Sequence, residues 1–255
     1  MKYLVMGVNG LVTKFTYRSN EITNLITQML QMTISICMWL SIYYSSGKYT
    51  INQMNAHQMI QYLVITNLTA ILFSTSPIFR FANQVQSGQL TTTLLRPISI
   101  YGEHMAFYIG TQFPYLCINF TLFILLSNHA TNALTFILLG YLILAFVMFF
   151  SLMLVIGTLS FWLINMWPLR SAINACSLIL GGLYFPLSFL GQKTFRWLQF
   201  NPFSLVSDVP ARVITHKIND LSPYIIAVVI WLLLTMIVYQ RLIKIGIKKY
   251  EGIGI

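Results

Sequence analysis

Charged residues are scarce in this chain. Only 8% of its 255 residues are charged, which is about a third of the share in a typical soluble domain. Its hydrophobic residues, 57% of the total, gather into runs of about 20, the length that an α-helix needs to cross a bilayer. The scarcity of charge excludes an ordinary soluble domain and predicts an all-α, polytopic membrane protein.

Acidic residues are the scarcest charged type, and the chain has five. We expect all of them at membrane edges or in loops: Glu21, Glu103, Asp208, Asp220 and Glu251. A proton- or sodium-coupled carrier normally holds an ionisable group near the middle of the membrane. The positions of the acids therefore disfavour an ion-coupled secondary carrier.

Cysteine and histidine offer no metal site or catalytic site. The three cysteines and four histidines stand far apart in the sequence: Cys37, Cys117, Cys176, His57, His104, His129 and His216. No CxxC, HExxH or GxSxG motif is present, so we expect packing cysteines, interfacial or loop histidines, and no enzyme activity. Gly47-Lys48 is not a phosphate-binding loop because Tyr49 follows the lysine where Ser or Thr is required.

The apolar runs predict six transmembrane helices in one domain that covers 1–255. They lie at about 23–45, 58–79, 104–127, 133–163, 169–190 and 222–243. None is short enough to suggest half of a broken helix. The first two spans thus occupy 23–79 and the next three occupy 104–190.

Lysine and arginine set the orientation of these spans. With the N-terminus in the cytoplasm, inner segments hold ten of the 15 Lys and Arg residues, and four of the five outer ones lie in the long loop 191–221. This excess predicts that both termini are cytoplasmic. The net charge of +10 is spread over helix ends, so nucleic-acid binding is not expected.

Two segments outside the spans have an amphipathic pattern. In 2–20, one helical face carries the apolar residues Leu4, Val8, Leu11 and Phe15, which predicts a helix lying in the inner interface. Gly7 and Gly10 weaken that helix, so a frayed tail is the alternative. In 191–221, aromatic residues alternate with cations, which predicts re-entrant or surface helices at the outer side.

The loop 80–98 is too regular for a passive connector. Leu90, Leu94 and Leu95 recur at helical spacing, Gly88 permits a tight turn, and Arg96-Pro97 ends the helix. These features predict a short helix with an apolar docking face just outside the bilayer.

Several of these stretches resemble the type-2 ABC exporter permeases. The likeness rests on Thr16–Asn20, Trp39, Ile42-Tyr43 and above all Gly88 with Leu94-Leu95-Arg96-Pro97-Ile98. It extends from about residue 2 to 245 and is greatest to the subgroup once catalogued as a domain of unknown function, beside antibiotic and viologen exporters. Family members often carry a charge beside the loop glycine, whereas Ser87 and Gln89 stand here.

The resemblance implies an architecture and partners. It implies an interfacial helix in 2–20, a cytoplasmic coupling helix in 80–98 and extracellular re-entrant helices in 191–221. Two permeases, identical or homologous, would pair, and two ATPase subunits would supply the ATP and Mg that this chain lacks. The coupling residues would be Gly88, Leu90, Leu94, Leu95, Arg96 and Pro97.

The resemblance also implies a function. The chain would be a bacterial plasma-membrane permease that exports an amphipathic or hydrophobic substrate, such as a drug, an antimicrobial peptide or a lipid. Residues of the second and fifth spans would line the substrate path: Asn67, Phe73, Asn174, Gly181, Tyr184 and Phe185. An ion-coupled carrier and a non-transporting membrane scaffold are the alternatives.

The charge asymmetry leads to a test of topology. In a cysteine-free background, single cysteines at Gln89 and Gln192 should react with an impermeant maleimide from opposite sides of the membrane. Labelling of both positions from outside would contradict the six-span topology with a cytoplasmic N-terminus.

Overall fold

The computed structural model describes residues 2–52, 54–126, 132–163, 165–215, 217–218 and 220–250. This part of the chain is almost wholly helical, apart from a two-stranded antiparallel hairpin of β1 (Thr50–Ile51) and β2 (Met54–Asn55). Five of its helices are long and apolar enough to cross a membrane. The prediction of an all-α polytopic membrane protein is confirmed.

The helices fall into two halves along the chain. The first half contains α1 (Lys2–Thr16), α2 (Arg18–Ser46), α3 (Ala56–Ile71), α4 (Ser76–Gln86), α5 (Leu90–Leu94) and α6 (Ile100–Leu126). The second half contains α7 (Asn132–Thr158), the 3-10 turn η1 (Leu159–Phe161), α8 (Trp167–Leu180), the 3-10 turn η2 (Leu187–Leu190), α9 (Gln192–Leu198), α10 (Pro202–Val206), α11 (Asp208–Ile214) and α12 (Ser222–Lys249).

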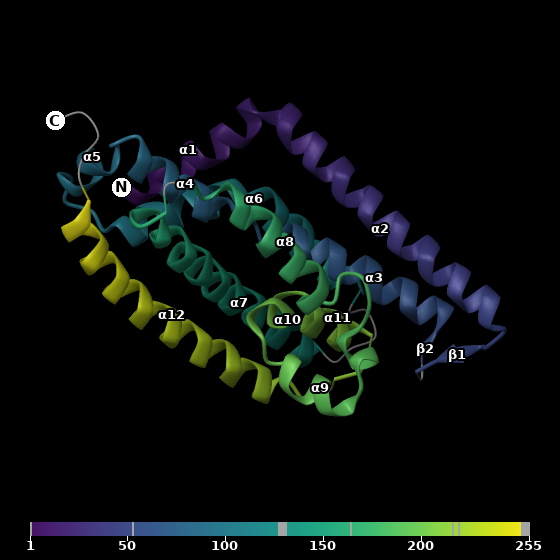
Figure 1. The fold of residues 1–255 in the computed structure, drawn as a ribbon. Helices are drawn as coiled ribbons and strands as arrows, with labels where there is room; N and C mark the ends of the chain where they lie inside the picture. Colours follow the sequence, from purple (N-terminus) through teal and green to yellow (C-terminus); the bar gives the residue numbers. More distant parts are fainter. Residues whose placement is uncertain are drawn as a thin grey trace.

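The bundle has two distinct ends (Figure 1). The first residues of α1, all of α5 and the last turn of α12 lie at one end, which we call the α5 end. The hairpin and α9 lie at the opposite end, the α9 end. A contact of 3.4 Å between the hydroxyl oxygens of Thr91 and Tyr250 joins α5 to the residue that follows α12.

The second predicted span is interrupted. α3 ends at Ile71 and α4 begins at Ser76, so the single run expected at 58–79 contains a break that its length did not indicate. Pro77 lies in the first turn of α4, where the missing N–H costs nothing. The backbone N–H of Ser74 donates to the hydroxyl of Tyr108 at 3.1 Å, which satisfies a group that the break frees.

The fifth predicted span is also shorter than expected. α8 has 14 residues, about 21 Å at the helical rise, against the 30 Å or so of a hydrocarbon core. Gly181 and Gly182 end it, and Gly182 has a φ of +75°. A Cβ at Gly182 would lie 2.3 Å from the hydroxyl oxygen of Tyr62, so close packing against α3 explains the turn that replaces the rest of 169–190.

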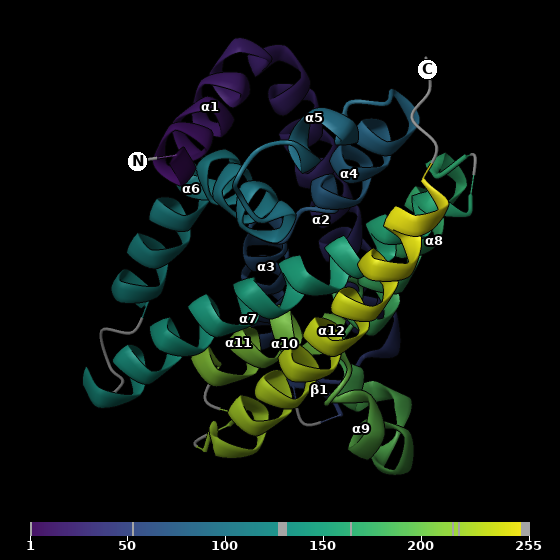
Figure 2. The same ribbon diagram turned by 90° about the vertical axis from the view of Figure 1, so that its left-hand side faces the viewer.

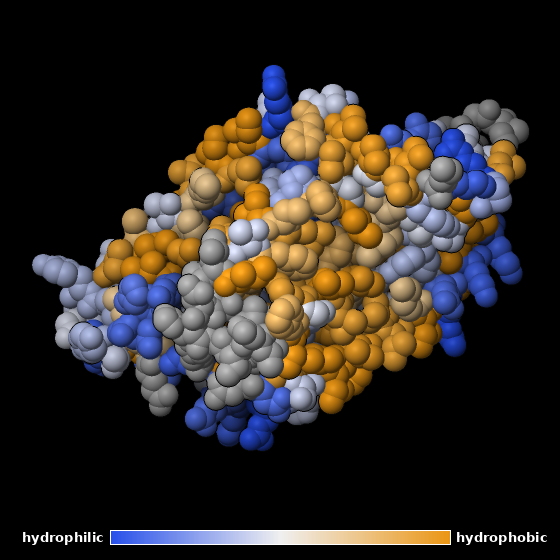
Figure 3. Space-filling view, turned by 180° about the vertical axis from the view of Figure 1, so that it is seen from behind, coloured by the Kyte–Doolittle hydropathy of each residue, from blue (hydrophilic) through white to orange (hydrophobic). Residues whose placement is uncertain are grey.

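The hydrophobic core is centred on α7, which packs against α4, α10 and α12. Its buried side chains are Leu138, Tyr141, Leu142, Ala145, Phe146, Met148, Phe149, Phe150, Met153 and Leu154. α2 and α12 instead expose many large apolar side chains. Figure 3 shows a broad hydrophobic surface with hydrophilic side chains toward its ends, as a lipid-facing bundle requires.

α1 is held against α6 by glycines (Figure 2). A Cβ at Gly110 would lie 1.8 Å from the carbonyl oxygen of Gly7, and one at Gly10 would lie 2.4 Å from the carbonyl oxygen of Phe107. The glycines that weaken an isolated helix therefore allow close helix packing here. Residues 2–16 form a helix rather than a frayed tail, while its position in the membrane interface stays a prediction.

This packing predicts a difference between two glycine substitutions. Gly110→Ala should lower the stability of the protein by about 1–3 kcal/mol, because the new methyl group overlaps the α1 backbone. Gly140→Ala on α7 is the matched control, since among the described residues no atom other than its chain neighbours and its own helix backbone lies within 4 Å of its Cβ position. Thermal unfolding in detergent measures both. Equal midpoints for the two variants would contradict the packing.

Candidate functional site

The segment that was predicted to couple the chain to a partner is a short helix after a sharp turn. Gly88 has a φ of +76°, as a tight turn requires. Leu90 is fully buried, whereas Leu94 is 40% exposed and Leu95 is 83% exposed. The three leucines do not form one apolar face, because α5 is little more than a turn and its buried residues are Leu90 and Thr93.

Arg96 and Pro97 follow α5 and are exposed. They line a cavity between α1 and the start of α6, together with Lys2, Met6 and Glu103. Of the predicted coupling residues, the structure therefore leaves Leu94, Leu95, Arg96 and Pro97 accessible at the α5 end.

A polar cluster fastens α4, the helix before α5, to α6. The guanidinium of Arg80 lies 3.7 Å from a carboxylate oxygen of Glu103 and 3.5 Å from the centre of the Phe107 ring. Gln84 donates from Nε2 to Glu103 at 3.5 Å, and its Oε1 lies 2.9 Å from Nε2 of His104. His104 and Glu103 are both buried within the protein, near the start of α6, while their position at the membrane interface stays a prediction.

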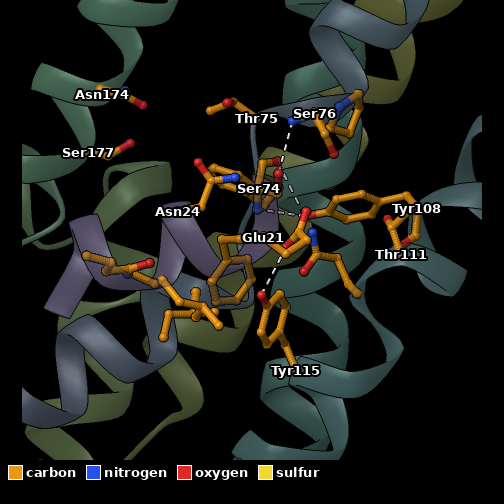
Figure 4. Close-up of a pocket in the computed structure, with 18 of the residues that line it drawn as sticks. Glu21, Asn24, Ser74, Thr75, Ser76, Tyr108, Thr111, Tyr115, Asn174 and Ser177 are labelled. Atoms are coloured by element: carbon orange, nitrogen blue, oxygen red, sulfur yellow. Dashed lines mark hydrogen bonds between the residues drawn. The ribbon is translucent and has the colours of Figure 1, made fainter. Parts of the chain in front are cut away.

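The break in the second span borders a cavity of about 550 Å³. Its walls come from the end of α1, the first half of α2, residues 70–77, α6 and α8. In Figure 4, Tyr108, Thr111 and Tyr115 lie on one side, and Asn174 and Ser177 lie on the other. The hydroxyl of Tyr115 donates to Glu21 at 3.0 Å.

Most side chains that line the cavity hydrogen-bond without carrying charge. The amides are Asn20, Asn24, Gln28, Gln31, Gln112 and Asn174. Aromatic rings, including Phe73, Phe107 and Phe149, complete the lining. The cavity is thus amphipathic, with both polar and apolar surface.

The charged side chains around the cavity are largely engaged in ion pairs or in contacts with aromatic rings. Lys14 lies 3.3 Å from Glu21 and 3.7 Å from the centre of the Tyr115 ring. Burial lowers the pKa of Lys14, and the attraction of Glu21 opposes this. Arg170 lies over the rings of Phe79 and Trp167.

The predicted substrate-path residues divide into two groups. Phe73 and Asn174 line the cavity. Asn67 is buried and donates to the carbonyl oxygens of Leu63 and Leu183, so it ties α3 to the end of α8.

The remaining three path residues lie beyond α8. The carbonyl oxygen of Gly181 accepts from Ser207 at 2.6 Å, and that of Tyr184 accepts from the Trp39 indole at 2.7 Å. Phe185 packs against the hydrophobic core. These contacts fasten the turn after α8 to its neighbours.

Sequence reasoning missed the α6 wall of the cavity. His104, Tyr108, Gln112 and Tyr115 recur at intervals of four, four and three residues, so they share one helical face. This polar stripe was the available signal, but the high overall hydropathy of the segment obscured it.

Sequence reasoning also missed a buried ion pair within α11. Asp208 is fully buried, and its carboxylate lies 2.7 Å from Nε of Arg212. Tyr62 donates to the same carboxylate at 2.5 Å, and Arg212 donates to the hydroxyl of Tyr224 at 3.2 Å. Burial alone would lower the pKa of Arg212, but Asp208 and Tyr224 raise it above its usual value.

Asp208 therefore lies in a packed helix rather than in an exposed loop, while its position relative to the membrane edge stays a prediction. α10 and α11 fold back onto α7 and α3, which turns a loop of the sequence into core. An ion-coupled carrier was disfavoured because no buried charge was expected, and the burial of Asp208 removes that ground. Asp208 is instead saturated by Arg212, Tyr62 and a weaker contact from Ser204, which leaves little capacity for a transported ion.

A protein-family model described as ABC-2 family transporter protein matches residues 29–254, most of the chain. No curated protein matches it.

The ion pair leads to a thermodynamic prediction. Asp208→Ala should lower stability by about 3–5 kcal/mol, because it leaves Arg212 buried without its partner. The double variant Asp208→Ala with Arg212→Met should be more stable than Asp208→Ala alone. Denaturant unfolding of the detergent-solubilised chain measures this, and Asp220→Ala is a control at an exposed acid that should change stability far less. Additive losses in the double variant would show that the pair does not interact.

Proposed function

Because the chain belongs to the ABC-2 family of transporter proteins, we propose that it is the permease of an ATP-driven exporter and that its ATPase subunits bind at α5. The observation that carries this proposal is the exposure of Leu94 and Leu95 beside a fully buried Leu90. Leu90 anchors the helix, while the two exposed leucines contribute little to the fold. Exposed apolar side chains on an anchored helix are suited to a protein partner.

The contacts of α4 would allow it to transmit a movement of α5 to the cavity. Its apolar face is buried through Ile78, Phe81, Ala82 and Val85, and Arg80 joins it to Glu103 on α6. A displacement of α5 would therefore move α4 as a rigid element. Since α4 begins at the break that borders the cavity, closure of the ATPases would reshape the cavity.

The remaining parts of the proposal concern assembly and cargo. The excess of cations in the predicted inner segments supports cytoplasmic termini, with α5 on the cytoplasmic side of a bacterial plasma membrane. Two ATPase subunits would bind ATP and Mg, and a second permease, identical or homologous, would complete the transporter. The amphipathic lining of the cavity supports outward transport of an amphipathic substrate such as a drug, an antimicrobial peptide or a lipid.

The coupling proposal predicts the effect of removing the exposed leucines. Leu94→Ala combined with Leu95→Ala should weaken ATPase binding by about 10-fold or more, because each truncation removes part of an apolar contact. Co-purification of the ATPase and substrate-stimulated ATP hydrolysis measure the loss, and the unfolding midpoint of the permease should not change.

Two controls separate coupling from folding. Leu4→Ala removes an exposed leucine of α1 and should leave ATPase binding intact. Leu90→Ala should lower the unfolding midpoint, because it creates a cavity in the core. Wild-type ATPase binding and transport in the Leu94→Ala, Leu95→Ala variant would contradict the proposed coupling role of α5.

A further inference from the structure

The cavity that Arg96 and Pro97 line, which we call the α1 cavity, has a volume of about 750 Å³. Its walls are one side of α1, the residues 96–98 that follow α5, Arg80 of α4 and the start of α6. On α1 the lining residues extend from Lys2 to Thr13, a length of about 16 Å at the helical rise. The α1 cavity is therefore elongated, and it begins at the α5 end of the bundle (Figure 1).

Hydrogen bonds at the start of α1 hold two walls of this cavity together. The hydroxyl of Tyr3 accepts from the backbone N–H of Ser99 at 3.2 Å, and it lies 3.3 Å from the hydroxyl oxygen of Ser99. That hydroxyl oxygen also accepts from the N–H of Gly102 at 3.1 Å. Since Lys2 precedes Tyr3 and Arg96 lies just before Ser99 in the chain, these bonds bring both cations to the same cavity.

The two cations have no acidic partner among the described residues. Neither Lys2 nor Arg96 forms an ion pair there, and both side chains are exposed. Glu103 is the one acid among the described residues that line the cavity, and it lies 3.7 Å from Arg80. Because Arg80 and Glu103 compensate each other, the cavity retains an excess of positive charge.

Apolar surface on α1 adjoins these cations. Val5 and Val12 line the cavity and are 57% and 53% exposed. At 100° per residue they lie between the cavity face of α1 and an outer face with Leu4, Val8 and Phe15. Each of these three outer residues is more than half exposed. A ligand that satisfies both surfaces must carry a negative group and a hydrophobic chain.

We infer that the α1 cavity binds an anionic phospholipid, with its phosphodiester at Lys2 and Arg96 and an acyl chain along Val5 and Val12. The guanidinium of an arginine can donate two parallel hydrogen bonds to a phosphate. The long aliphatic stem of a lysine lets its ammonium reach the headgroup level. Basic pockets between helices on the cytoplasmic side suit anionic headgroups, and the α5 end is the predicted cytoplasmic end. Arg96, predicted as a coupling residue, thereby becomes a lipid contact.

An acidic segment of the ATPase is the other occupant that would suit the two cations. The course of α1 favours the lipid. From its first residues at the α5 end, α1 leads away from α5 toward the start of α2 (Figure 1). The exposed apolar surface therefore continues away from the helix at which the ATPase is proposed to bind.

A comparison of two lipids tests the recognition of charge. The full chain is delipidated in detergent without an ATPase and titrated with phosphatidylglycerol or phosphatidylcholine of identical acyl chains, and bound lipid is counted by native mass spectrometry. The anionic phosphatidylglycerol should bind about 10-fold more tightly or better, because two cations contact its headgroup. Equal affinities for the two lipids would overturn the inference.

Paired substitutions locate the effect. Lys2→Gln combined with Arg96→Gln should reduce the preference for phosphatidylglycerol about 5-fold or more and leave the affinity for phosphatidylcholine unchanged. Lys248→Gln combined with Lys249→Gln is the matched control. It removes the same charge from the last turn of α12, at the same end of the bundle, from residues that do not line the cavity. Equal loss of preference in both double variants would indicate a general effect of surface charge and contradict the assignment.

The substituted side chains are exposed, so the unfolding midpoints of both double variants in lipid-free detergent should match that of the unsubstituted chain. The comparison of the two lipids on the unsubstituted chain needs no variant, and it decides the inference even where a substitution impairs folding.

Two further measurements separate the alternatives. Glycerophosphoglycerol has the same headgroup without acyl chains and should not displace phosphatidylglycerol at equal concentration. Displacement would identify a site for free phosphate esters and overturn the lipid assignment. Loss of ATPase binding in the Lys2→Gln, Arg96→Gln variant with an unchanged lipid preference would identify an ATPase contact and also overturn it. Because lipid binding is measured without an ATPase, its absence is distinguishable from failure of the coupling proposal.

Discussion

Backbone groups in the break between α3 and α4 must find partners inside the protein, because lipid offers none. The N–H groups of Leu72 and Phe73 donate to the last carbonyl oxygens of α3, and that of Ser74 donates to Tyr108. Because these N–H groups are hydrogen-bonded within the protein, the interruption of the helix does not leave them unpaired in the membrane. The interruption in turn shapes the border of the cavity and sets the start of the helix that leads to α5.

A buried ion pair stabilises the packing of α11. Asp208 and Arg212 are buried together, Tyr62 donates a hydrogen bond to Asp208, and Arg212 donates one to Tyr224. This network fastens α11 to α3 and α12. α10 and α11 are therefore part of the core, and we expect the bundle to move mainly where α4, α5 and α8 border the cavity.

Much of this fold follows from patterns visible in the sequence. Hydropathy and run length indicate the long helices, and Gly88 correctly predicts the turn before α5. The break at 72–75 and the short α8 were missed, because a hydropathy run does not show where close packing, as at Gly182 against Tyr62, ends a helix. The burial of Asp208 and His104 was missed for a related reason, because it depends on partners distant in the chain. Of the predicted path residues, Phe73 and Asn174 line the cavity, while the polar stripe of α6 was hidden by apolar neighbours.

The central claim is that displacement of α5 reshapes the cavity through α4. The most direct test is a spin-label distance between Ser76, at the start of α4, and Asn174, on α8, in a cysteine-free background. The distance is measured in the permease–ATPase complex with and without vanadate-trapped nucleotide. The account predicts a shift in the distance distribution on trapping, which Leu94→Ala with Leu95→Ala abolishes. An unchanged distribution in a complex that still hydrolyses ATP would contradict it.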